Sequence, residues 1–184
     1  MGNRTEIDAA NGWQLRTIRR LLSHSFFQSF IAALVLTKLD FSNATLAGIQ
    51  LFQLYRLQAV MNAAAHLVFQ PSPREHITPL LYWLHWLRAP QRIAYKHAVL
   101  VYQCLRGLAP AYMTADLQPV TELPGRRRLR SSSTLALAVP RTRLWTIGDR
   151  AFPIAAARTW NSLPPEVTSS RTLSSFKSEL KTFI

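Results

Sequence analysis

The chain has 184 residues, of which 48% are hydrophobic and 10% aromatic, and its formal net charge is +13. This apolar content is sufficient for a packed core, so the composition excludes a chain that is disordered throughout. A positive surplus of this size favours a polyanionic partner such as nucleic acid.

The first predicted helix follows Ser25, a residue suited to cap a helix N-terminus. Behind it, apolar residues recur at steps of three and four, the spacing of a helix face: Phe27, Phe30, Ile31, Leu34 and Val35. The most apolar run, residues 26–36, is 11 residues long, whereas a membrane span needs about 20. We therefore expect a core helix and no membrane-spanning segment.

A second apolar row predicts another helix, which Pro71 and Pro73 would end. Its members are Leu54, Leu57, Met61, Ala64, Ala65 and Val68. A third helix is expected to open at Pro90 and to end at a Gly107 cap. Its apolar row is Ile93, His97, Leu100 and Cys104, opposite Arg92, Lys96, Gln103 and Arg106. Successive helices with such rows indicate a helical bundle.

The helical period ends at about residue 118, where a basic segment begins. Between Pro124 and Arg158 the sequence has eight arginines and one carboxylate, Asp149. Alternating residues at 134–139 and 143–147 flank Pro140-Arg141-Thr142 and predict a small β-hairpin. Helical spacing then returns in residues 151–160.

A terminal helix is expected behind Thr172, which would cap it. One face of this helix would consist of Leu173, Phe176, Leu180 and Phe183.

Arginines interleaved with an aromatic residue predict a nucleic-acid interface, because guanidinium groups bind phosphates and aromatic rings stack on unpaired bases. The candidate binding residues are Arg126, Arg127, Arg128, Arg130, Arg141, Arg143, Trp145 and Arg150. The alternative for the arginines is a solvated basic loop. Trp145 is either a stacking residue or an anchor of the hairpin, and for Trp160 we favour an anchor in the core.

No catalytic residue, metal ligand or cofactor site is predicted. The nine carboxylates offer no obvious cluster to hold the metal ions of phosphoryl transfer, and a glycine-rich phosphate loop and a nucleophile elbow are both missing from the sequence. His97 and Cys104 are seven residues apart on one predicted row, where a core histidine and a buried thiol are favoured over a metal pair. We expect a protein that is not an enzyme, with no small-molecule substrate.

The single cysteine excludes an internal disulfide and favours a reducing compartment. Glu6 and Asp8 precede any apolar run, so a secretory signal is not expected. We expect an intracellular protein, nuclear or cytoplasmic, and the sequence leaves its oligomeric state open.

Several blocks in order along the chain resemble non-LTR retrotransposon reverse transcriptases of the jockey type, in the region that follows the polymerase palm. Early blocks are Leu39-Asp40-Phe41-Ser42-Asn43, His76-Ile77-Thr78-Pro79-Leu80-Leu81 and Arg106-Gly107-Leu108-Ala109-Pro110-Ala111-Tyr112. The most specific blocks are Val139-Pro140-Arg141-Thr142-Arg143-Leu144, Gly148-Asp149-Arg150-Ala151-Phe152 and Trp160-Asn161-Ser162-Leu163-Pro164. The aromatic-X-Asp-Asp signature of that family's catalytic site is absent from this sequence, so the resemblance does not extend to polymerase activity.

The residue patterns predict a mainly α protein with a helical bundle, a basic loop, a small β-hairpin and short C-terminal helices, and the resemblance implies that the bundle is thumb-like. The expected divisions are an unmatched leader (1–12), the bundle (13–117), the basic loop (118–133) and the hairpin with C-terminal helices (134–184). The implied function is that of a non-catalytic remnant of an RNA-directed DNA polymerase, which binds the backbone of RNA or DNA. The alternatives are a non-functional, partly folded fragment and a helical protein-interaction module with Trp83 and Trp86 as anchors.

Overall fold

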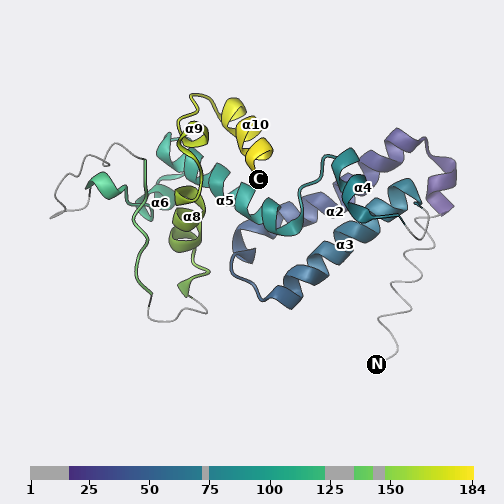
Figure 1. Ribbon diagram of the computed structural model, residues 1–184, viewed down its shortest axis with the longest axis horizontal. Helices are drawn as coiled ribbons and strands as arrows, with labels where there is room; N and C mark the ends of the chain where they lie inside the picture. The colour runs from purple at the N-terminus through teal and green to yellow at the C-terminus, as the bar shows by residue number, and fades with distance from the viewer. Residues whose placement is uncertain (1–16, 72–74, 123–134, 143–147) are drawn as a thin grey trace. The chain divides into compact units, whose positions relative to one another are not determined.

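The computed structural model describes residues 17–71, 75–122, 135–142 and 148–184. Within these ranges the regular elements are helices, and the β structure is one isolated bridge. The predicted mainly α class is therefore confirmed. The chain divides into two compact units, Met1–Phe41 with Phe52–Ala89, and Ser42–Leu51 with Pro90–Ile184 (Figure 1). The predicted bundle, 13–117, is thus distributed over both units, and the domain boundaries drawn from the sequence remain a prediction.

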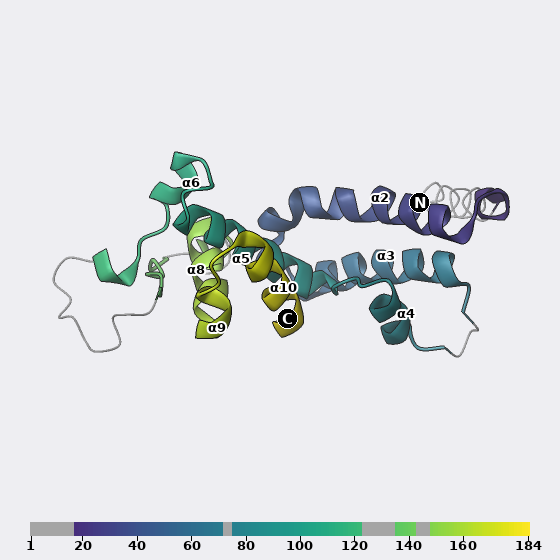
Figure 2. The same ribbon diagram turned by 90° about the horizontal axis from the view of Figure 1, so that it is seen from above.

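The first unit is built on an antiparallel helix pair, α2 (His24–Ser42) and α3 (Leu51–Phe69), and the short α4 (Ile77–Trp83) follows α3 (Figure 2). Of the predicted row on α3, Leu54 and Leu57 are only half-buried, whereas four members are buried, Met61, Ala64, Ala65 and Val68. These pack against Phe27 and Ile31 of α2. The two alanines on this face add no side-chain bulk that would hold the helices apart.

A tight turn after α4 returns the chain to this core. His85 has a positive φ of 54°, and the N–H of Trp86 donates to the carbonyl of Leu81 at 2.9 Å. The turn buries Trp86 among the core residues, whereas Trp83 is 71% exposed. The prediction that both tryptophans are exposed anchors is therefore wrong for Trp86.

The second unit is organised around α5 (Ala89–Leu105). Pro90 lies in its first turn, as predicted. Gly107 ends it with a φ of +67°, and the N–H of Leu108 reaches back to the carbonyl of Gln103 at 2.8 Å. This is the C-terminal capping geometry that glycine adopts without strain, so the predicted cap is confirmed.

Shorter elements surround α5 in this unit. They are η1 (Asn43–Leu46), α6 (Ala111–Ala115), η2 (Val120–Glu122), α8 (Phe152–Asn161), α9 (Pro165–Thr168) and α10 (Leu173–Phe183). Thr172 caps α10 as predicted, because its hydroxyl accepts from the N–H of Ser175 at 3.2 Å. Of the predicted apolar face, Phe176 and Leu180 are buried, whereas Phe183 is exposed.

Aromatic rings from three helices form the centre of the second core. Tyr102 of α5 stacks on Phe176 of α10 with centroids 4.4 Å apart, and Trp160 of α8 meets the same phenylalanine at 5.8 Å. The indole N–H of Trp160 donates to the carbonyl of Leu135 at 2.8 Å. Trp160 is therefore a core anchor, as the sequence favoured.

The segment around Leu137 does not lie in a hairpin within the described residues. It pairs with Pro119 in an antiparallel bridge, so its partner is the chain just before the basic segment, while residues 143–147 lie outside the described ranges. On its other side the Leu137 backbone is bound by the Asn161 side chain, through an N–H to Oδ1 bond of 2.9 Å and an Nδ2 to carbonyl bond of 2.8 Å. The amide of Asn161 thus takes the place of a second strand.

Three finer predictions about the helices are wrong. Ser25 lies inside α2, which begins at His24. Phe30 and Leu34 are exposed because only one edge of the predicted row meets α3. Leu100 of α5 is half-buried rather than buried. Among the helices in the described ranges, none is both long and apolar enough to cross a bilayer.

Candidate nucleic-acid interface

Of the eight predicted binding residues, the structure places Arg141 and Arg150. Both side chains are exposed, and both belong to the second unit. The other six lie outside the described residues, namely Arg126, Arg127, Arg128, Arg130, Arg143 and Trp145. The described part of the candidate interface is therefore the turn that leads into α8.

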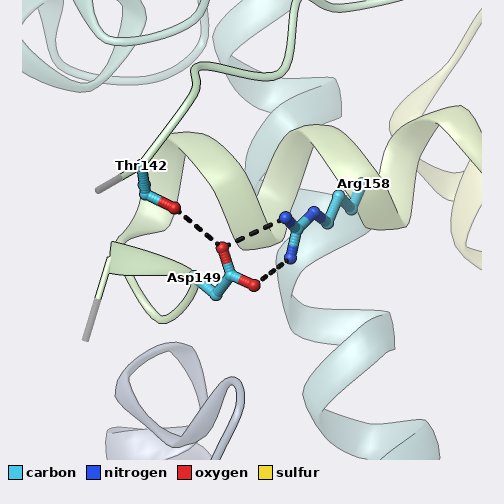
Figure 3. A network of polar contacts seen from close by, with 3 residues as sticks. All are labelled: Thr142, Asp149 and Arg158. Carbon is cyan, nitrogen blue, oxygen red and sulfur yellow. Dashed lines mark hydrogen bonds and ion pairs between the residues drawn. The ribbon is translucent and has the colours of Figure 1, made fainter. Parts of the chain in front are cut away.

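Asp149, the carboxylate of the basic segment, is held at this turn by two partners (Figure 3). Its Oδ2 forms an ion pair with Arg158 Nη1 at 2.8 Å, and its Oδ1 accepts from Arg158 Nη2 and Thr142 Oγ1, each at 3.1 Å. The hydrogen bond from Arg158 is the main reason that the pKa of Asp149 lies below its usual value, and the same contact raises the pKa of Arg158. Asp149 and Arg158 thus neutralise each other.

Close packing fixes the neighbours of Asp149. A Cβ on Gly148 would lie 2.6 Å from Cβ of Thr142, so only glycine fits there without displacing the chain. The stem of Arg150 lies against Gly48, where a Cβ would be 2.9 Å from Arg150 Cγ. Gly48 also has a φ of +63°, which favours glycine. The stem of Arg150 is therefore closely packed against Gly48, although the residue as a whole is exposed.

This support of the turn was not predicted from the sequence. The sequence did contain an indication of it, because Asp149 is the sole carboxylate among the eight arginines of residues 124–158 and could be expected to pair with one of them. Arg106 was also placed only on a polar helix face, yet it donates to the carbonyl of Ser170 at 2.9 Å and lies over the Tyr102 ring.

His97 and Cys104 are both buried, as the sequence favoured. The ring nitrogens of His97 lie 2.9 Å from the carbonyl of Ile93 and 3.1 Å from that of Ala44, so the ring is engaged with the backbone. Burial lowers the pKa of His97 and raises that of the Cys104 thiol. Both groups are therefore neutral near pH 7, which suits core residues.

In the described ranges, no group of three or more His, Cys, Asp or Glu side chains is arranged to hold a metal ion. Comparison with family models, curated proteins and solved structures gave no match to this chain.

Proposed function

We propose that this chain binds RNA or DNA through the phosphate backbone and catalyses no reaction itself, as a remnant of a retrotransposon reverse transcriptase. In a full-length polymerase, a thumb of this kind would hold the primer–template duplex. The arginine segment would extend that contact along the backbone.

The observation that carries the proposal is the excess of positive charge within one stretch of the sequence. Residues 124–158 contain eight arginines and a single carboxylate, and that carboxylate is bound to Arg158. It is therefore already engaged and offers little compensation to the other arginines. A polyanion would supply the missing counter-charge.

Titration at several salt concentrations tests this proposal. The quadruple alanine variant at Arg126, Arg127, Arg128 and Arg130 should bind more weakly and show a log–log salt slope smaller by about 3, since each phosphate contact contributes about 0.7–0.9. The matched control removes four exposed basic residues elsewhere: Arg20, Arg56, Lys177 and Lys181. Equal losses in the two variants would mean that total charge, rather than the segment, determines binding. An unchanged slope in the first variant would leave the arginines as a solvated loop.

The non-catalytic part of the proposal needs its own test. Purified protein should not extend a primer on an RNA template with Mg²⁺ or Mn²⁺. Extension that survives repurification would contradict it.

A second candidate function is a helical protein-interaction module. It is favoured by two adjacent exposed aromatic residues of α4, Tyr82 at 78% and Trp83 at 71% exposure, because large aromatic residues are enriched at binding hot spots. A partner whose binding is lost in Trp83→Ala, and retained in the arginine variant, would support this function over nucleic-acid binding.

A further inference from the structure

The second unit contains an open cavity of about 650 Å³ beside Arg150. Its partly buried apolar lining comes from Leu100 of α5, Met113 of α6 and Phe152 of α8. Phe152 is itself supported by His97, whose ring stacks on it at 6.1 Å. The volume is within the range of small-ligand sites, which are mostly apolar with a few placed polar groups.

Three side chains of different chemistry lie at the exposed part of this lining: Tyr112, Asp116 and Arg150. Tyr112 is 73% exposed, so its ring is not used by the core. Asp116 brings an acceptor, and Arg150 brings a cation whose stem is held against Gly48. An aromatic ring, an acceptor and a cation therefore surround one apolar hollow.

We propose that this cavity receives an unpaired nucleobase of a single strand, with Tyr112 stacking on the base and Arg150 contacting the adjacent phosphate. The inference rests on the proposed nucleic-acid binding and adds the part of the ligand that the second unit recognises. A base matches the lining because it has two apolar faces, which stack on aromatic rings. Its edge carries N–H groups that can donate hydrogen bonds to the Asp116 carboxylate.

Arg150 and Arg141 together outweigh the single carboxylate of Asp116, so the charge near the cavity favours an anionic strand over a neutral apolar ligand. Within the described part of the chain, Arg150 forms no ion pair with a carboxylate. Arg141 is exposed as well, and its neighbour Thr142 is hydrogen-bonded to Asp149. A strand whose base occupies the cavity would bring its negatively charged backbone to this basic turn.

The test uses the full chain and two fluorescent oligonucleotides of equal length and charge, one with bases and one abasic throughout. The wild-type protein should prefer the strand with bases. Tyr112→Ala should weaken binding of that strand by about 5- to 150-fold, the equivalent of one lost stacked base, and should leave the abasic strand unaffected. Tyr112→Phe keeps the ring and should retain the preference.

Two further variants separate stacking from charge. Tyr82→Ala removes an equally exposed tyrosine of the first unit and should change neither affinity. Arg150→Ala should weaken both strands and reduce the salt slope by about 0.7.

The outcomes distinguish this inference from the proposed function. If wild type binds both strands equally, or if Tyr112→Ala keeps the full preference, the cavity does not hold a base, while phosphate binding stands. If wild type binds neither strand at low salt, the proposed function and this inference are both overturned.

Discussion

Replacing Asn161 with alanine should destabilise the second unit, because this side chain is the hydrogen-bond partner of a buried backbone position. The bridge to Pro119 uses the carbonyl of Ala136 and the N–H of Ala138, which bond to Val120 and Gln118. The N–H and carbonyl of Leu137 point to the other side and bond to Asn161. Leu137 is only 2% exposed. The substitution therefore leaves its backbone N–H and carbonyl buried without a hydrogen-bond partner.

The magnitude follows from the cost of unpaired polar groups. Each lost hydrogen bond is worth about 0.5–1.5 kcal/mol net, and a buried unpaired group costs about 1–3 kcal/mol. Asn161 is itself exposed, so water can replace part of what it provides. We expect a loss of about 1–3 kcal/mol, or a fall in Tm of about 2–4 °C per kcal/mol for a chain of this size.

The assay is urea unfolding together with hydrogen exchange of the Leu137 amide. Ser162→Ala is the control, since the Ser162 hydroxyl donates only to Thr159 of the same helix turn, at 2.7 Å. Asn161→Ala should speed exchange at Leu137 and lower the unfolding midpoint, whereas the control should do neither. Unchanged exchange at Leu137 would refute the role assigned to Asn161.

Three other predictions follow from burial. Met61→Ala should lower the free energy of unfolding of the first unit by about 2–5 kcal/mol, whereas Leu100→Ala should cost less, because Leu100 is only half-buried. Calorimetry of both variants measures the difference, and a larger loss at Leu100 would contradict the packing. Because burial holds the pKa of His97 below its ordinary value of 6.5, the unfolded chain binds the proton more readily. Stability should therefore be retained above pH 6.5 and should decline as the pH falls below it; unfolding curves should show this slope in wild type and a weaker one in His97→Gln. The Cys104 thiol is 2% exposed with a raised pKa, so a thiol reagent at pH 8 should label it slowly in the native protein and rapidly in urea, and fast native labelling would contradict its burial.

The sequence predicted those features that depend on local rules. Helix period located the buried row of α3, and the residue preferences of caps located Pro90, Gly107 and Thr172. These features are set by neighbours three or four residues apart, which a single sequence displays.

Apart from the Ser25 cap, the main features that were missed depend on distant partners. Trp86 is buried because His85 turns the chain back after α4, in a left-handed conformation that is uncommon for residues other than glycine. The segment at Leu137 alternates as a strand would, but its partners are Pro119 and the side chain of Asn161. The period of a segment indicates that it is extended and does not identify what it pairs with.

The candidate interface was predicted by type of residue rather than by geometry. Arg150 was identified from charge, whereas the contacts that hold its turn, Gly48 against its stem and Arg158 on Asp149, join residues that sequence spacing does not connect. Tyr112 and Asp116 carried no pattern of their own, and they become candidates only because the fold places both beside one cavity.

The joining of α5 to the C-terminal helices has a consequence for synthesis on the ribosome. The hydroxyl of Tyr102 bonds to the carbonyl of Ser170, 68 residues later, and Phe176, against which Tyr102 stacks, comes later still. At about 5–20 residues per second, α5 is made roughly 3–14 s before the helices that cover it. During this interval its apolar face has no native cover from α10, and a nascent chain stalled before Ser170 should therefore be a good substrate for chaperones that bind exposed apolar helices.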